Sequence, residues 1–326
     1  MRIALTGGTG FIGGALVKRL LAEKHSVRAL ARSPGKAKEL AASGVEVVQG
    51  DLSDAGAIER TAEGAEIFYH LGARVSGGGA EQEYMEANAG GTERVLQACV
   101  RQGVRRAIYH SSLAVYGAGY GESAIDESTA FDAKAELRGY YAQSKIAADR
   151  AAVSFAREKG FSLVLFRPGL VYGPGRIPLG LLAFAMGKLR FVFGRPEMHV
   201  PLNYVENLLD AMEMAGRMES SGPEEFNIVD DENLTLEDYH RELRAADGGR
   251  TFFLPGWPVE FSSPAVDGVT RALGLMGDSR FSRYQVKRMV EDRFYSTERA
   301  RKRLDWRARV PLGEAIRKSV EAKRQR

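Results

Sequence analysis

Apolar and polar positions along residues 1–170 follow two alternating patterns. Short apolar runs, typical of buried strands, occur at 2–6, 26–31, 45–49, 66–70, 107–111 and 162–167. Amphipathic helical spacing occurs between them, through Leu16, Leu20 and Leu21 and then at 36–42, 55–62, 88–101 and 141–158. Strands that alternate with helices indicate a parallel sheet with right-handed crossovers. We therefore predict an α/β protein with a Rossmann-type doubly wound parallel sheet.

The pattern changes after residue 167. Gly, Pro and apolar residues cluster at 168–193, and residues 251–277 have no regular pattern. A helix is predicted at 203–217 and one more strand at 225–229. We expect a Rossmann domain over 1–170, which 203–230 rejoins, and a smaller C-terminal capping region made of 171–202 and 231–326.

Composition narrows the class of protein. Of the 326 residues, 44% are apolar and 27% are charged, which is ordinary for a globular protein. No uncharged run reaches the ~20 residues of a membrane-spanning helix, so we expect no integral membrane insertion. The single cysteine, Cys99, excludes an internal disulfide framework and a multi-cysteine metal site. We expect a cytoplasmic protein that holds no metal.

Charge gathers at the C-terminus, where residues 298–326 carry 11 Lys or Arg against 4 Asp or Glu. Such a tail can meet nucleic acid or an anionic membrane surface. Apolar residues interrupt the charges, however, and 313–323 has the pattern of a solvated amphipathic helix. Neither stacking aromatic residues nor a nucleic-acid-binding motif accompanies the tail, so we expect no nucleic-acid partner.

A glycine-rich segment, TGGTGFIG at residues 6–13, lies between the first predicted strand and the first predicted helix. It matches G-x-G-x-x-G through Gly8, Gly10 and Gly13, and G-x-x-G-x-x-G through Gly7, Gly10 and Gly13. Bare backbone and a helix N-terminus suit a pyrophosphate, whereas the alternative is a tight turn without a ligand. We predict that a dinucleotide contacts Gly7, Gly10, Phe11, Ile12 and Gly13.

The end of the second predicted strand bears on the choice of dinucleotide. NAD-binding proteins often carry an acidic residue there, about 20 residues beyond the glycines, but this chain has Arg32 and Ser33. We predict that Arg32 meets a 2′-phosphate, with Ser33 and Arg28 assisting. This favours NADP, with NAD as the alternative, although Arg32 could also be an ordinary surface arginine.

Candidate catalytic residues fall in two segments. Tyr141 and Lys145 are four residues apart in a predicted helix and therefore share one face. A nearby ammonium favours the phenolate, which suits Tyr141 to acid or base catalysis. Ser111 and Ser112 follow the fifth predicted strand, at the sheet edge where ligands bind in such folds. One serine can bind the substrate oxygen while the other bonds backbone in a turn.

Taken together, these segments resemble an extended short-chain dehydrogenase/reductase of the NAD(P)-dependent epimerase/dehydratase family. The similarity runs from Arg2 to about Val229. It rests on TGGTGFIG, GDL at 50–52, FYHLGA at 68–73, NAGGT at 88–92, SS with VYG at 111–117, Tyr141 with Lys145, and RPGLVYGPG at 167–175.

The resemblance implies roles for further residues. It implies that Ser112 joins Tyr141 and Lys145 in catalysis and that the C-terminal region binds the substrate. It also implies a set of cofactor contacts: Asp51 and Leu52 at the adenine, Leu71, Gly72 and Ala73 beside the cofactor, Pro168 and Val171 at the nicotinamide, and Tyr141 and Lys145.

Departures from the family pattern narrow the chemistry. Leu113 and Ala114 stand where family dehydratases have acidic residues, which disfavours elimination of water. Family epimerases that act through a carbanion typically need a Cys–Lys pair. The single cysteine, Cys99, lies on an apolar helix face, where packing in the core is its expected role. What is left is hydride transfer with one acid/base group, either in an oxidoreductase of a secondary alcohol or ketone or in a nucleotide-sugar epimerase.

Other features separate these two alternatives. Arg176, Lys188, Arg190 and Arg195 could bind the diphosphate of a nucleotide sugar. The apolar run at 178–186 suits a lipophilic alcohol or ketone and resembles the 3β-hydroxysteroid dehydrogenase-like branch, although a helix packed on the sheet would look the same. A cofactor-binding redox sensor or scaffold is a third possibility, against which the Tyr141–Lys145 pair argues. The resemblance also implies a homodimer formed through the helices at 88–101 and 141–158.

Overall fold

The computed structural model describes residues 1–326 except 77, 122, 181, 273–281 and 325–326. Its contacts divide the chain into two compact units. The sheet unit consists of Met1–Ala114, Tyr140–Arg167 and Ala211–Phe226. The second unit consists of Val115–Gly139, Pro168–Asp210 and Asn227–Arg326. The chain passes from one unit to the other several times.

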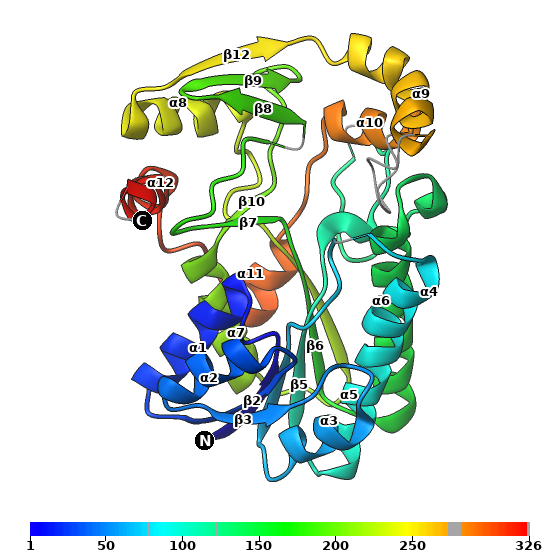
Figure 1. Cartoon of the computed structure of the whole chain (residues 1–326), viewed down its shortest axis with the longest axis vertical. Helices are drawn as coiled ribbons and strands as arrows, with labels where there is room; N and C mark the ends of the chain where they lie inside the picture. Colours follow the sequence, from blue (N-terminus) through cyan, green and yellow to red (C-terminus); the bar gives the residue numbers. More distant parts are fainter. Residues whose placement is uncertain (77, 122, 181, 273–281, 325–326) are drawn as a thin grey trace. The chain divides into compact units, whose positions relative to one another are not determined.

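A seven-stranded sheet organises the first half of the chain, in the order β11-β6-β5-β4-β1-β2-β3 (Figure 1). The ladders from β3 to β6 are parallel. Its strands are β1 Arg2–Thr6, β2 Ser26–Ala31, β3 Glu46–Gln49, β4 Ile67–His70, β5 Arg106–His110, β6 Leu163–Pro168 and β11 Pro223–Ile228. Six of the strands thus follow the 3-2-1-4-5-6 order of a Rossmann fold, which confirms the predicted fold class.

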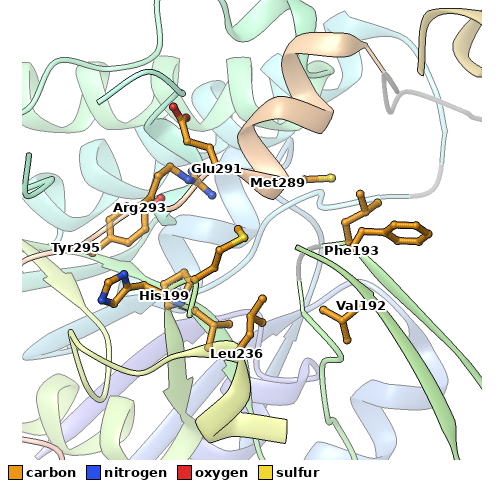
Figure 2. A pocket seen from close by; sticks show the side chains of 12 residues that line it. Val192, Phe193, His199, Leu236, Met289, Glu291, Arg293 and Tyr295 are labelled. Atoms are coloured by element: carbon orange, nitrogen blue, oxygen red, sulfur yellow. The ribbon is translucent and has the colours of Figure 1, made fainter. Parts of the chain in front are cut away.

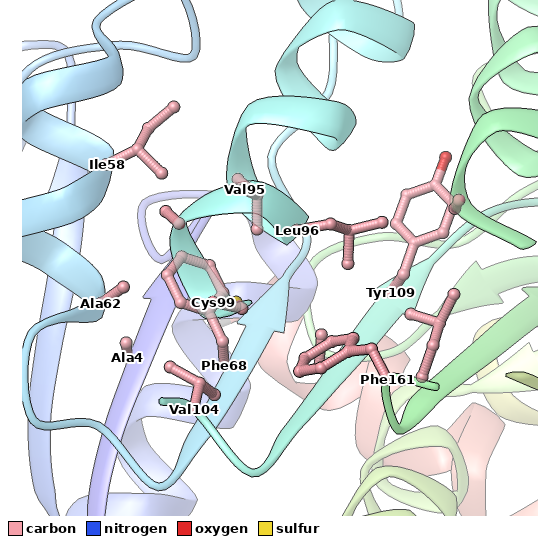
Figure 3. Close-up of a cluster of buried hydrophobic side chains, with 14 of the residues drawn as sticks. Ala4, Ile58, Ala62, Phe68, Val95, Leu96, Cys99, Val104, Tyr109 and Phe161 are labelled. Atoms are coloured by element: carbon pink, nitrogen blue, oxygen red, sulfur yellow. The ribbon is translucent and has the colours of Figure 1, made fainter. Parts of the chain in front are cut away.

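Helices connect the strands of this sheet: α1 Phe11–Ala22, α2 Pro34–Ala42, α3 Ala55–Ala62, α5 Gly91–Arg101, α6 Tyr140–Lys159 and α7 Val205–Arg217. The apolar faces of α3, α5 and α6 form a core against the sheet, and Figure 3 shows Phe68, Leu96 and Phe161 within it. Cys99 is fully buried in this core, in the packing role expected for it.

Two predicted helices differ at their starts. The helix predicted at 88–101 is observed as three consecutive parts: α4 Glu81–Met85, a π-helical turn at Glu86–Gly90, and then α5. Such a turn inserts a residue into the helical period, which periodicity alone does not reveal. The helix predicted at 203–217 begins at Val205, because the preceding segment pairs as β10 Leu202–Tyr204.

The second unit contains two small sheets. One pairs β7 Leu170–Tyr172 with β10, and the other has the order β12-β9-β8. The strands of the latter are β8 Ala183–Met186, β9 Leu189–Phe193 and β12 Arg250–Leu254. The helices of this unit are α8 Leu236–Asp247, α9 Trp257–Ala272, α10 Arg283–Val290, α11 Glu298–Leu304 and α12 Leu312–Arg324.

One alternative and one expectation for this unit are contradicted. The helix that was the alternative for the apolar run at 178–186 is not present in its described residues, which end in β8 between Gly180 and Gly187, both at positive φ. A short apolar run bounded by glycines does not distinguish a strand from a helix. The segment 251–277 contains β12 and α9, whereas its last residues, 273–277, lie outside the described part. The tail helix expected at 313–323 is present as α12.

Within the described residues, none of the helices combines the length and apolarity needed to cross a bilayer. No group of three or more His, Cys, Asp or Glu side chains in the same residues is arranged to hold a metal ion.

Candidate active site

The glycine-rich loop turns tightly between β1 and α1. Gly7 has φ +78°, and its carbonyl accepts a hydrogen bond from Gly10 N at 2.9 Å. A Cβ on Gly13 would lie 2.1 Å from Gly7 O. Side chains at Gly7 or Gly13 would therefore force the loop open, which explains why the motif requires glycine at these two positions.

The loop lies against the segment that follows β4. A Cβ on Gly7 would lie 2.7 Å from Gly72 N, and Gly72 N donates to Thr6 Oγ1 at 3.0 Å. Leu71 N donates to Thr6 O at 3.3 Å. The structure thus brings together Gly7 and the Leu71–Gly72 pair, which the sequence suggested only as separate cofactor contacts.

The first turn of α1 suits an anion. The N-cap residue of α1, Gly10, makes no side-chain hydrogen bond to the helix, and no acidic residue lies in the first turn. The backbone N–H groups of Phe11 and Ile12 belong to this turn, where a helix N-terminus attracts negative charge. A dinucleotide pyrophosphate fits this bare, glycine-lined turn.

The residues at the ends of β2 and β3 suit the adenosine half of the cofactor. Arg32 is exposed just after β2, and its charge lowers the pKa of Asp51, after the larger effect of hydrogen bonds from Ser53. Leu52 O accepts from Arg94 Nη1 at 2.7 Å, which fixes the loop. Arg28, which was expected to assist Arg32, has other partners in the structure. Its guanidinium is bound to Glu46 at 2.8 Å and to carbonyl groups at the end of α3.

The two serines after β5 have different environments. Ser111 is fully buried, and its Oγ donates to Asp149 Oδ1 at 2.5 Å. Ser112 is only partly buried, and its Oγ accepts from Ala114 N at 3.1 Å. Ser111 therefore joins β5 to α6, whereas Ser112 is the serine whose oxygen a substrate can reach.

Lys145 lies on α6 one turn beyond Tyr141, and its side chain is buried. Its Nζ donates to Tyr109 Oη at 3.0 Å and to His110 O at 2.9 Å. Burial lowers the pKa of Lys145 to about 8, and the charge of Asp149 opposes part of that effect. An ammonium with this pKa is poised to titrate near neutral pH, which is typical of functional lysines.

Two neighbours of Lys145, Tyr109 and Asp149, did not stand out in the sequence. Tyr109 precedes the candidate Ser111 by two residues and so points to the same side of the sheet, and Asp149 lies four residues beyond Lys145 on α6. These spacings in the sequence could have identified both residues. His110 Nε2 is buried without a hydrogen-bond partner among the described residues, and burial lowers the pKa of His110 to about 3. This neutral imidazole has a polar atom left for a bound molecule.

Asn88 links the loop after β4 to the catalytic helix. It accepts from Arg74 N at 2.7 Å, and its Nδ2 donates to Arg74 O and to Ser144 Oγ, both at 2.9 Å. Ser144 Oγ donates to Tyr141 O at 2.9 Å. The π-helical turn supplies this asparagine, an example of such a turn at a functional site. Asn88 thereby fixes the backbone of Tyr141.

Other expected site residues belong to the second unit. Pro168 ends β6 and Val171 lies in β7, so their place at the nicotinamide stays a prediction. Arg190, one of the residues considered for a diphosphate, is buried and paired with Asp247. That pairing weakens the case for Arg190 as a ligand of a second anion.

The second unit contains a small, mainly apolar pocket with one charged end (Figure 2). Val192 and Leu236 line it, and Arg293 stands beside Glu291 on the opposite side. Arg293 is buried, its Nη1 donates to Gly117 O at 3.4 Å, and its Nε has no partner among the described residues. A guanidinium and a carboxylate thus lie together at this end of the pocket.

The strand order, the glycine loop and the Tyr141–Lys145 helix together define a Rossmann-type dinucleotide-binding protein. Residues 3–229 match the model of the NAD dependent epimerase/dehydratase family, and the chain belongs to that family. It is an NAD-dependent enzyme of the oxidoreductase or epimerase type.

Relatives share this fold over almost the whole chain. The 2-alkyl-3-oxoalkanoate reductase of Shewanella oneidensis is 27% identical over 96% of this chain and 84% of its own length. The 3 beta-hydroxysteroid dehydrogenase/Delta 5-->4-isomerase of Mycobacterium tuberculosis is 27% identical over 97% and 88%. The structure of MoeE5 in complex with UDP-glucose and NAD is 22% identical, with a TM-score of 0.74 over 100% of this chain and 99% of its own. At that identity the likeness shows the fold alone.

Proposed function

We propose that the protein is an NADP-preferring oxidoreductase that interconverts a secondary alcohol and a ketone. The observation that carries this proposal is the arrangement at the end of β5. Partly buried Ser112 follows that strand, and buried Lys145 is bound to Tyr109 and His110 on the strand itself. Tyr141 precedes Lys145 by one helical turn.

Each of these side chains has a distinct part in the reaction. Bound nicotinamide supplies or accepts the hydride at the carbinol carbon. Ser112 Oγ donates a hydrogen bond to the substrate oxygen, and Tyr141 Oη transfers the hydroxyl proton. Lys145, in its charged form, favours the Tyr141 phenolate and binds the nicotinamide ribose.

The cofactor contacts follow the sheet edge. Gly7, Gly10 and Gly13, with the N–H groups of Phe11 and Ile12, hold the pyrophosphate. The remaining proposed contacts are Arg32 at the 2′-phosphate, Asp51 and Leu52 at the adenine, and Leu71, Gly72 and Ala73 beside the cofactor. The preference for NADP rests on exposed Arg32, which stands after β2 where NAD-binding proteins often carry an acidic residue.

We propose a lipophilic ketone as the substrate, bound by the second unit. The named activities of both curated relatives, on an oxoalkanoate and on a steroid, support this class. The nucleotide-sugar epimerase is the alternative.

Two further proposals concern the state of the protein in the cell. A cytoplasmic location is supported by the single, buried Cys99, since disulfide-dependent proteins are typical of oxidising compartments.

A homodimer through α5 and α6 would bury Val100, an exposed apolar residue on α5. Light scattering on the purified protein measures the mass that tests the dimer.

A hydride-transfer assay tests the function. The protein receives NADPH or NADH carrying tritium at C4 of the nicotinamide, with 2-alkyl-3-oxoalkanoates and steroid ketones in one panel and nucleotide sugars in another. We expect label in a released alcohol, faster from NADPH. Interconversion of nucleotide sugars without net use of the cofactor would establish the epimerase instead. Cofactor binding with no turnover in either panel would indicate a sensor or scaffold.

A further inference from the structure

The small sheet β12-β9-β8 of the second unit has two different faces. Arg190 and Val192 of β9 are buried on the inner face, and Phe253 of β12 packs edge-on against His240 of α8 at 5.8 Å between ring centroids. The inner face is therefore covered by α8. Because side chains alternate along a strand, the intervening residues point to the opposite, outer face.

The register defines the members of this outer face. Residues directly opposite each other in a ladder share a face. Phe184 pairs with Phe191 and Met186 with Leu189, while Leu189, Phe191 and Phe193 pair with residues of β12. The outer face thus consists of Phe184, Met186, Leu189, Phe191, Phe193, Arg250, Phe252 and Leu254.

Seven of these eight positions are apolar, and several are open to water. The exposed fractions are 45% for Phe184, 65% for Met186, 40% for Leu189 and 45% for Phe252. Phe191 stacks on Phe184 at 4.9 Å and on Phe252 at 5.5 Å, so the rings form one continuous apolar surface across three strands. A monomeric soluble protein rarely leaves such a patch uncovered, which marks it as an interaction surface.

The charges at the edge of this face indicate its partner. Arg250 stands at one end of the face, and exposed Lys188 occupies the adjoining turn between β8 and β9. None of the eight face positions, all within described strands, is acidic. A second copy of the same face would bring no carboxylate to these cations, whereas the phosphates of an anionic lipid surface would.

The segment that follows β12 also combines exposed aromatic rings with a nearby cation. Helix α9 begins three residues after β12, and its Trp257 and Phe261 are each 64% exposed. Arg283 of α10 lies over the Phe261 ring, 4.8 Å from its centroid. Aromatic rings with flanking Lys and Arg are the side chains found at the boundary between lipid headgroups and acyl chains.

We propose that the outer face of β12-β9-β8 docks this protein reversibly on an anionic membrane surface. Phe184, Phe191 and Phe252 enter the headgroup–acyl boundary, and Lys188 and Arg250 contact lipid phosphates. Binding of this kind needs no membrane-spanning helix. It is separate from the proposed catalysis by Ser112, Tyr141 and Lys145, because none of these residues lies on the face; of the face residues, Phe193 also lines the pocket of Figure 2.

Vesicle co-sedimentation with the full-length protein tests the proposal. Vesicles contain either pure phosphatidylcholine or equal parts of phosphatidylcholine and phosphatidylglycerol, at low ionic strength. We expect the protein to pellet with the anionic vesicles and to be released by salt. Phe184→Ser/Phe252→Ser should weaken binding roughly tenfold or more. The control, Val75→Ser, changes an exposed apolar residue of the sheet unit that lies outside the proposed dimer interface, and it should bind like wild type.

A second variant keeps the test valid if the phenylalanine variant unfolds. Lys188→Ser/Arg250→Ser should weaken binding to anionic vesicles by about 30-fold, because each cation near such a surface contributes about fivefold. Lys36→Ser/Lys38→Ser, which removes two exposed lysines of α2, is its control. Absence of wild-type pelleting with anionic vesicles would overturn the proposal. So would unchanged binding by the folded variants, or a dimer that Phe184→Ser/Phe252→Ser dissociates.

Discussion

Ser111 and Asp149 form a buried hydrogen bond between the end of β5 and α6, with 2.5 Å from Oγ to Oδ1. Arg167 Nε donates to the other oxygen of the same carboxylate at 2.9 Å. Asp149 thereby joins two strands to the helix that carries Tyr141 and Lys145. The adjacent Ser112 takes no part in this bond, so we propose separate functions for the two neighbouring serines.

Replacing each serine separately distinguishes these functions. We expect Ser112→Ala to lower kcat by roughly a hundredfold or more, because a donor to the substrate oxygen is lost. Ser111→Ala should leave kcat within a few-fold of wild type. It should lower the free energy of unfolding by about 1–3 kcal/mol, since Asp149 loses a buried partner. Steady-state kinetics and urea unfolding measure both effects, and the reverse pattern would exchange the roles.

Tyr141→Phe removes the proposed acid/base hydroxyl and little else. We expect kcat to fall by about 10²–10⁴-fold while the Kd for NADPH stays near that of wild type. Tyr140→Phe is the matched control, since Tyr140 is the adjacent aromatic residue and packs against Tyr84. Equal losses in the two variants would remove Tyr141 from the mechanism.

Cofactor affinity should depend on pH through Lys145. Burial lowers the pKa of Lys145 to about 8, so its ammonium is present below that pH and is lost above it. We therefore expect NADPH binding, followed by nicotinamide fluorescence, to weaken as pH rises through about 8. In Lys145→Met the same titration should be flat across this range. A flat wild-type curve would show that the charge of Lys145 does not hold the ribose.

His70 should make the fold sensitive to acid. Its ring bonds Thr6 at 2.7 Å and Thr92 at 3.1 Å, and burial, with the charge of Lys145, lowers its pKa to about 3. Between that value and the ordinary 6.5, the unfolded chain binds a proton that the folded chain does not, so stability falls as pH falls.

Removing this imidazole should make the decline less steep. We expect His70→Gln to reduce the slope of unfolding free energy against pH by about 1.4 kcal/mol per pH unit between pH 6 and 4. Urea denaturation across that range measures the slope. An unchanged slope would mean that His70 is not neutral in the fold.

Arg32→Ser tests the choice of cofactor. Loss of a charge-assisted hydrogen bond to the 2′-phosphate should weaken NADPH binding roughly tenfold or more and leave NADH binding unchanged. Lys36→Ser removes a nearby exposed cation and should change neither affinity. Equal weakening for NADPH and NADH would place Arg32 away from the 2′-phosphate.

Local patterns along the chain were sufficient for the Rossmann sheet. Strand and helix periods, together with glycines that no larger residue could replace, indicated β1, α1 and the loop between them. The Tyr141–Lys145 spacing likewise identified one helix face, because these signals act over a few residues. Where a short apolar run lay between Gly180 and Gly187, the same signals did not separate a strand from a helix.

Tertiary structure decided the features that depend on distant residues. Only the fold shows that Ser111 rather than Ser112 bonds Asp149, that Lys145 is bound to Tyr109, and that Arg28 is bound to Glu46. The register of β8, β9 and β12 likewise gathers four phenylalanines from two separate segments on one face. Hydrogen bonds and burial depend on which surfaces meet in space, whereas a sequence pattern records only the neighbours along the chain.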